Sequence, residues 1–218
     1  MSTGGAGGES SAWTPCPEDA PCRIMPFGAS ITDGYNVPGG YRIHLWALVD
    51  MADKSIDFVG SLSNGPSELP DKEHEGHSGW KIAELDAIAA ERLTTYVPQI
   101  ILVHAGTNDV RNADDLPNAP NRLRALVDTM TSTAPEALVV LASLVPVDDV
   151  QDQLAMDAFN AEVPVIVEEN VNAGKHVVFA DMASALDVAD LADGVHPTAA
   201  GYDKMATVWF DIVATMLP

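Results

Sequence analysis

Short apolar runs alternate with helix-like segments along most of this 218-residue chain. The runs expected to form strands are 23–27, 56–60, 99–105, 137–143 and 176–180, and the segments expected to form helices are 40–53, 81–96, 120–133, 153–173 and 198–216. Strands that alternate with helices are joined by crossovers, so we expect a mostly parallel, five-stranded sheet with helices on both faces. The fold class is therefore α/β, with functional residues at the carboxyl ends of the strands.

The composition limits the partners that this chain can have. Hydrophobic residues make up 47% of the chain, but no apolar run reaches the roughly 18 residues that a membrane span needs. The formal net charge of −21 repels nucleic-acid phosphates and anionic lipid headgroups. We therefore expect a soluble, globular domain that binds neither nucleic acid nor membrane.

The N-terminal region indicates a tether and a possible disulfide. Residues 2–12 are rich in Gly and Ser, which predicts a flexible linker over 1–15 and one domain over 16–218. Cys16 and Cys22 could close a small loop as a disulfide, which would imply an oxidising compartment; two free thiols are the alternative. No signal peptide is visible, and a linker that opens directly at Met1 suggests that an export signal was removed from a secreted protein.

Three polar strings follow predicted strands. They are Gly-Ala-Ser-Ile-Thr at 28–32, Gly-Thr-Asn-Asp at 106–109 and Asp-Gly-Val-His-Pro at 193–197. A serine hydroxyl is a weak nucleophile until a base takes its proton, and His196 can be that base for Ser30. Asp193 precedes His196 by three residues, a spacing that lets its carboxylate orient the imidazole. With Asn108 as a donor to an oxyanion, the strings contain what an ester hydrolase needs.

The strings resemble the sequence blocks of the SGNH (GDSL-type) hydrolase superfamily. Block I corresponds to 28–35, block II to His-Ser-Gly-Trp at 77–80, block III to 106–109 and block V to 193–197. The segments 24–28, 39–42 and 74–80 are similar to family 3 carbohydrate esterases, which remove acetyl groups from xylan and related polysaccharides. One position departs from the pattern, because Ala29 stands where block I usually has Asp or Asn.

The resemblance implies a single-domain, three-layer, flavodoxin-like fold and assigns the site residues. Ser30, Asp193 and His196 would be catalytic, and the oxyanion hole would comprise the N–H groups of Ser30 and Gly79 and the side-chain amide of Asn108. The residues expected as candidates for the substrate pocket are Tyr41, Arg42 and Trp80, although core packing explains Trp80 equally well.

We expect a secreted serine esterase that removes small acyl groups, acetyl above all, from carbohydrate such as acetylated xylan. No cofactor is expected for catalysis. His74, Glu75 and His77 lack the His-Glu-x-x-His spacing of a metal site, and the acidic stretch 148–152 favours a solvated loop over a structural calcium site.

Two alternative functions remain open from the sequence. One is a lipase or lysophospholipase of the same superfamily, which the polar loop 61–79 disfavours. The other is a catalytically weakened carbohydrate-binding domain, to which Ala29 lends some support. Neither the polysaccharide nor the oligomeric state follows from the sequence.

Overall fold

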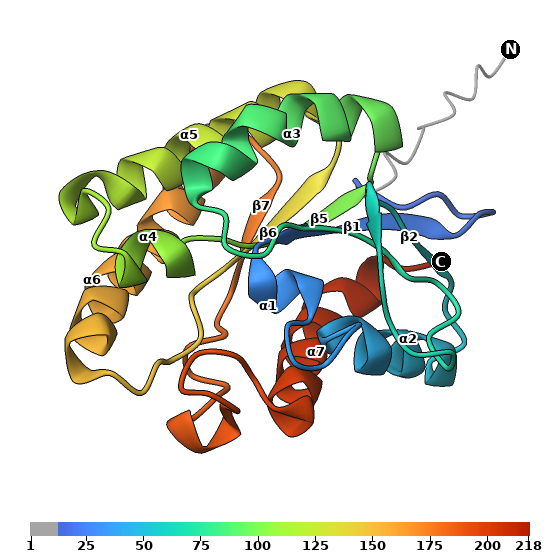
Figure 1. Ribbon diagram of the computed structural model, residues 1–218. Coiled ribbons are helices and arrows are strands. Elements are labelled where there is room, and N and C mark those ends of the chain that lie inside the picture. Colours follow the sequence, from blue (N-terminus) through green and yellow to red (C-terminus); the bar gives the residue numbers. More distant parts are fainter. Residues whose placement is uncertain (1–12) are drawn as a thin grey trace, which may run out of the picture.

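A mostly parallel sheet lies between two layers of helices (Figure 1). The structure, a computed structural model, describes residues 13–218. Its strands are β1 (Cys22–Gly28), β2 (Ile56–Phe58), β3 (Leu62–Ser63), β4 (Glu73–Gly76), β5 (Ile100–His104), β6 (Leu138–Ala142) and β7 (Val177–Ala180). Its α-helices are α1 (Ser30–Asp33), α2 (Tyr41–Met51), α3 (Ile82–Tyr96), α4 (Thr107–Arg111), α5 (Ala119–Thr133), α6 (Val150–Asn172) and α7 (Ala199–Val213). Short 3₁₀ turns occupy Leu116–Asn118, Val188–Asp190 and Ala214–Met216.

The strand order is that of a flavodoxin-like sheet. The five predicted strands pair in parallel in the order β2-β1-β5-β6-β7. The chain therefore places β2 on one side of β1 and then crosses to the other side, where β5, β6 and β7 follow in order. The sheet also contains β4, which extends the pairing of β1 beyond β2, and β3, which is antiparallel to β4. These two short strands lie in the segment 61–79, which the sequence predicted as a loop because it is polar and lacks a strand-like run.

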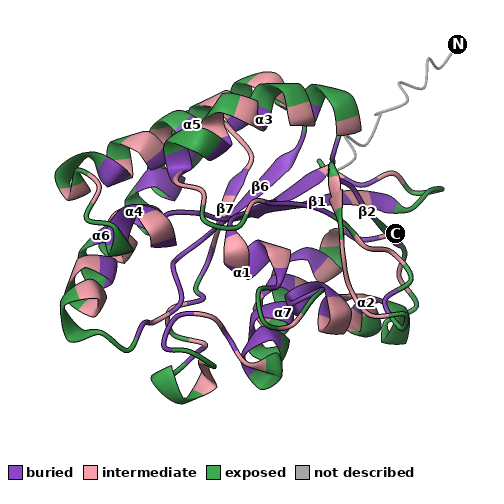
Figure 2. Ribbon diagram, in the orientation of Figure 1, coloured by how far each residue is buried: buried purple, intermediate pink, exposed green. Residues whose placement is uncertain are grey.

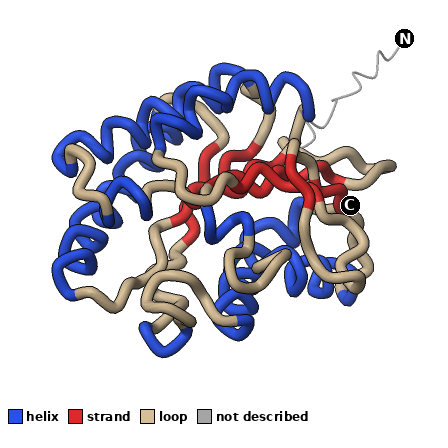
Figure 3. Tube along the Cα trace, viewed as in Figure 1, coloured by secondary structure: helices blue, strands red, loops and turns tan. Residues whose placement is uncertain are grey.

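Each face of the sheet has its own hydrophobic core. Helices α3, α4, α5 and α6 cover one face, while α1, α2 and α7 cover the other (Figures 1 and 3). Alternate residues of β5 serve the two cores: Ile101 and Val103 pack toward the first helix layer, and Ile100 and Leu102 toward the second. Because both faces are covered, β5 and β6 are buried along their whole length and β1 along most of it, whereas the short strands β2, β3 and β4 each include an exposed residue (Figure 2). None of the helices within residues 13–218 is long and apolar enough to span a bilayer.

The predicted helices are all present, and two further short ones were missed. Helix α6 begins at Val150, earlier than predicted, because the Asp149 carboxylate caps it by accepting from the N–H groups of Gln151 and Asp152. Helices α1 and α4 contain four and five residues, too few to produce a helical pattern of apolar residues. Each directly follows a strand, and together they carry Ser30 and Asn108.

The start of the described chain is fastened to the domain. Cys16 and Cys22 form the predicted disulfide, with their Cα atoms 5.0 Å apart. The Trp13 ring stacks on the His176 ring with 3.6 Å between centroids, so the described part of the predicted linker contacts the domain. Residues 1–12 of that linker lie outside the described residues.

His104, the last residue of β5, is buried beneath the site. Its Nε2 accepts a hydrogen bond from the Val145 N–H at 3.4 Å, and burial lowers the pKa of the imidazole to about 4. In an unfolded chain the pKa would be near 6.5, so the unfolded state binds a proton on His104 before the native state does. Stability supplied by the neutral imidazole is therefore lost as pH falls from about 6.5 to about 4.

We expect His104→Gln, which keeps an acceptor for Val145, to weaken this acid sensitivity. Between pH 7 and pH 4.5 the free energy of unfolding should fall by about 2–3 kcal/mol less in the variant than in the parent protein. Urea titrations at the two pH values measure this difference. Equal decreases in the two proteins would show that His104 does not couple folding to pH.

Candidate active site

The structure brings Ser30, His196 and Asp193 into one hydrogen-bonded relay. The Ser30 hydroxyl lies 2.9 Å from His196 Nε2, although 166 positions separate the two residues in the sequence. On the other side of the ring, His196 Nδ1 lies 2.9 Å from Asp193 Oδ2 and 3.1 Å from Oδ1. With the imidazole proton on Nδ1, Nε2 is free to accept the serine proton. This is the arrangement of a nucleophile, a base and an orienting carboxylate.

The Asp193 carboxylate is held by its own loop. Its Oδ1 accepts from the N–H groups of Val195 and His196, at 3.1 and 2.8 Å. Partial burial opposes the charged form, but hydrogen bonds from the backbone and ring of His196 outweigh it and hold the pKa of the Asp193 carboxyl at about 2. Asp193 is therefore ionised across the pH range in which an esterase works, and it faces the imidazole as an anion.

A turn after α1 adds two residues that the sequence did not indicate. Asn36 Nδ2 donates to Asp193 Oδ2 at 3.0 Å, giving that oxygen a second donor besides the imidazole. The Tyr35 ring lies 4.5 Å from the His196 ring, between centroids, and is 49% exposed. Both residues follow closely after Gly34, which ends α1 in the left-handed conformation at φ 88°. Their sequence neighbourhood reads as an ordinary turn, so only the tertiary structure reveals these contacts.

The three expected oxyanion donors lie on α1, on the turn 77–80 and on α4. Residues 77–80 form a turn in which the Trp80 N–H donates to the His77 carbonyl at 3.1 Å, and Gly79 has φ 86°. The Asn108 side-chain amide donates one hydrogen to the Trp80 carbonyl at 2.8 Å, which leaves its second hydrogen for a ligand. Within residues 13–218, the N–H groups of Ser30 and Gly79 donate to no acceptor. All three donors are thus available to a substrate oxygen.

Asp109, next to Asn108, anchors α4 rather than taking part in the relay. Its buried carboxylate accepts from the Ile82 N–H at 2.9 Å and from Arg122 Nε at 3.0 Å. These contacts tie α4 to the start of α3 and to α5. They hold the Asn108 side chain in place at the end of β5.

Two of the pocket candidates were predicted wrongly. The side chains of Tyr41 and Arg42 are fully buried, so neither lines an accessible pocket. The apolar surroundings raise the pKa of the Tyr41 phenol and lower that of the Arg42 guanidinium to about 10. Arg42 instead holds the β3–β4 region through the carbonyls of Asn64 and Lys72, at 3.2 and 2.6 Å. Both residues lie on α2, and the tertiary packing of this helix, which the sequence does not reveal, buries them.

Trp80 packs partly against the core, which is one of the two roles considered for it. Its ring packs against the core beneath α3 and stacks on the His77 ring with 4.1 Å between centroids. His77 is itself fixed by Glu75, whose Oε1 lies 2.7 Å from Nε2. Trp80 is half-buried and adjoins Gly79, so a wall of the substrate pocket remains the prediction for its exposed part.

The histidines and acidic residues that were weighed as metal ligands have other partners. His74 Nδ1 accepts from the Gly76 N–H at 3.1 Å, and burial lowers the pKa of its imidazole to about 3. In the acidic stretch, Asp149 caps α6 and Asp152 lies 3.5 Å from Arg111. Across residues 13–218 no three His, Cys, Asp or Glu side chains gather where they could hold a metal ion.

Comparison with known proteins identifies the family of this chain. Residues 27–204 match the GDSL-like Lipase/Acylhydrolase family. A multidomain esterase from Ruminococcus flavefaciens is 34% identical over 217 residues, covering 87% of this chain and 28% of that protein. The chain spans less than two thirds of the length of the curated relatives that it matches.

Solved structures give the same relationship. A family 3 carbohydrate esterase from Clostridium thermocellum has a TM-score of 0.81 and 34% identity, covering 90% of this chain and 99% of that one. A family 3 carbohydrate esterase from Talaromyces cellulolyticus has a TM-score of 0.78 and 25% identity, covering 89% and 97% of the two chains.

The fold and the family match define the class of this protein as the SGNH hydrolases. The chain belongs to the GDSL-like lipase/acylhydrolase family. Within this family it is similar to the family 3 carbohydrate esterases, as its sequence blocks predicted.

Replacing Asn108 by Ala is expected to lower kcat by about 100- to 1,000-fold, since it removes one donor to the oxyanion. The free energy of unfolding should change little, because Asn108 is only half-buried and water can replace its bond to Trp80. Hydrolysis of p-nitrophenyl acetate and urea unfolding measure the two effects. Asn112→Ala, at the exposed end of the same helix, is the matched control and should retain full activity. A folded Asn108→Ala variant with unchanged kcat would exclude Asn108 from the oxyanion hole.

Proposed function

We propose that this protein is a secreted serine esterase that removes acetyl and other small acyl groups from carbohydrate, such as acetylated xylan. The observation that carries the proposal is the relay in which 2.9 Å separates Ser30 Oγ from His196 Nε2 and 2.9 Å separates Nδ1 from Asp193 Oδ2. The carbohydrate substrate is supported by 34% identity to a family 3 carbohydrate esterase across 99% of that chain. The disulfide between Cys16 and Cys22 supports an oxidising, extracellular location.

The reaction would proceed through an acyl-enzyme. His196 Nε2 takes the Ser30 hydroxyl proton as Oγ bonds to the ester carbonyl carbon, and Asp193 stabilises the imidazolium. The carbonyl oxygen becomes an oxyanion, which accepts hydrogen bonds from the Ser30 and Gly79 amides and the Asn108 side chain.

The tetrahedral intermediate then collapses. The bond between the carbonyl carbon and the sugar oxygen breaks, and His196 returns its proton to the departing sugar hydroxyl. A water molecule repeats the sequence on the acyl-serine, with His196 as the base. The products are the free hydroxyl of the sugar, the carboxylic acid and regenerated Ser30.

No step of this mechanism calls on a cofactor, and the partner we propose is the acylated carbohydrate itself. Tyr35 and the exposed part of Trp80 are the aromatic surfaces nearest to His196 and Gly79, so a sugar ring would meet them first. The strongly negative chain favours neutral polysaccharide over an anionic polymer.

The chain length of the acyl group separates this proposal from a lipase. Hydrolysis of p-nitrophenyl acetate, butyrate and octanoate should be fastest with acetate, and Ser30→Ala should abolish it in all three cases. Release of acetate from acetylated xylan then tests the natural substrate class. A maximum at octanoate would assign the protein to the lipases instead.

Ala29 motivates a different outcome of the same experiment. Binding of xylan without turnover of any ester would indicate a carbohydrate-binding domain with a weakened site. Ala29→Asp would then restore the usual block I residue, and recovered activity would trace the loss to this position.

A further inference from the structure

Residues 77–80, here called the oxyanion turn, contain a central peptide between Ser78 and Gly79. The orientation of this peptide decides where the Gly79 N–H points. Gly79 has φ 86° while Ser78 is not in the left-handed region, which is the pattern of a type II turn. Type I and type II turns differ by a flip of the peptide between the two central residues, here the Ser78 carbonyl and the Gly79 N–H. A flip would therefore reverse the N–H that is expected to bind the oxyanion.

The ends of the oxyanion turn are fixed, but its centre is open. The His77 N–H donates to the Gly28 carbonyl at 2.9 Å, and the Trp80 carbonyl accepts from Asn108. Ser78 and Gly79 are exposed, and a Cβ built on Gly79 would meet no atom within 4 Å. Packing therefore favours neither orientation of the Ser78–Gly79 peptide.

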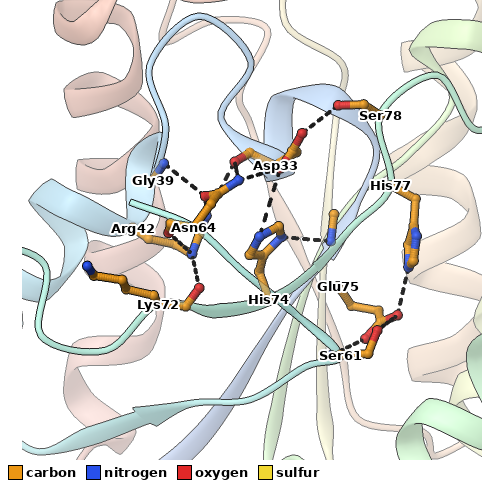
Figure 4. A network of polar contacts seen from close by, with 11 residues as sticks. Asp33, Gly39, Arg42, Ser61, Asn64, Lys72, His74, Glu75, His77 and Ser78 are labelled. Carbon is orange, nitrogen blue, oxygen red and sulfur yellow. Dashed lines mark hydrogen bonds and ion pairs between the residues drawn. The ribbon is translucent and has the colours of Figure 1, made fainter. Parts of the chain in front are cut away.

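One hydrogen bond does reach the centre of the turn. The Ser78 hydroxyl donates to Asp33 Oδ2 at 2.6 Å (Figure 4). Asp33 is the last residue of α1, the short helix that begins with Ser30. The bond therefore connects the helix of the nucleophile to the turn that carries an oxyanion donor.

Asp33 is a rigid anchor for this bond. Its Oδ1 and its carbonyl both accept from the Asn64 side-chain amide, and the carbonyl also accepts from Arg42 Nη2 at 3.3 Å. Arg42 is fully buried and also donates to Asn64 Oδ1 at 2.6 Å (Figure 4). Asn64, in the segment after β3, thus holds the Asp33 carboxylate through Oδ1, and Arg42 of α2 holds Asn64 and the Asp33 carbonyl. Oδ2 is left for Ser78.

We propose that Asp33 and Ser78 are positioning residues that hold the Ser78–Gly79 peptide with its N–H ready for the oxyanion. This inference rests on the proposed esterase function and deepens it. We call this Asp33–Ser78 hydrogen bond the clamp. Arg42 and Asn64 support the clamp from within the protein.

The test variant is Ser78→Ala, which removes an exposed hydroxyl and leaves no cavity. With p-nitrophenyl acetate, kcat should fall by about 10-fold, a fraction of the loss caused by removing a donor outright. KM and the melting temperature should stay at the parent values, because the contact acts on the oxyanion rather than on folding. Ser78→Thr keeps the hydroxyl and should restore most of kcat.

Two further variants complete the experiment. Ser63→Ala, at an exposed position on β3 that takes no part in the clamp, is the matched control and should be fully active. Asp33→Ala should lower kcat, and the double variant Asp33→Ala/Ser78→Ala should be no slower than the slower single variant, since both changes remove the same hydrogen bond; Asn at position 33 is unsuitable because its amide could donate to Ser78 Oγ. Unchanged kcat in Ser78→Ala, or a multiplicative loss in the double variant, would overturn the proposal.

A measurement without substrate separates the clamp from the esterase function. NMR relaxation dispersion at the Gly79 amide should be flat in the parent protein and pronounced in Ser78→Ala, because the freed peptide flips on the microsecond to millisecond timescale. A flat profile in Ser78→Ala would refute the clamp even in a protein without activity. Absence of Ser30-dependent hydrolysis in the parent protein would instead refute the proposed function and leave this reading of the turn intact.

Discussion

The burial of β1 on both faces and both edges is the constraint on which the remaining structure depends. β1 pairs with β2 and β4 along one edge and with β5 along the other, and its side chains alternate between the two cores. Because β1 is enclosed in this way, the chain can become accessible to a substrate only beyond the end of the strand. Ser30 follows directly after that end, so the position of the nucleophile is determined by the most firmly held element of the domain.

The site combines contacts of short and long sequence range, with different physical origins. Asp193 and His196 are oriented by a local turn, whose own N–H groups donate to the carboxylate. Ser30 meets His196 only through the tertiary structure, in which α7 packs beside α2. The oxyanion turn depends on contacts of both kinds. The local hydrogen bond from the Trp80 N–H to the His77 carbonyl shapes it. Contacts to Gly28, Asp33 and Asn108, which are distant in sequence, hold it in place.

Much of the fold could be predicted because apolar periodicity reports burial directly. The strands and long helices are buried on one or both sides, and their residue patterns show it. The short elements β3, β4, α1 and α4 carry no such pattern, and they form because neighbouring elements satisfy their backbone groups. Tyr41 and Arg42 illustrate the same limit, since a polar residue near a nucleophile in sequence can point into a core.

The sequence by itself determined the α/β architecture, the disulfide partners and the residues of the relay, because these depend on local pattern and on residue chemistry. Only the tertiary structure decided that Asn36 would contact Asp193, that Arg42 would be buried and that Asp33 would reach Ser78. Each of these contacts joins segments whose proximity is set by strand order and helix packing. A single chain's sequence carries no local signal for such contacts, since an exposed Asn, Asp or Ser in a turn reads the same with or without a partner.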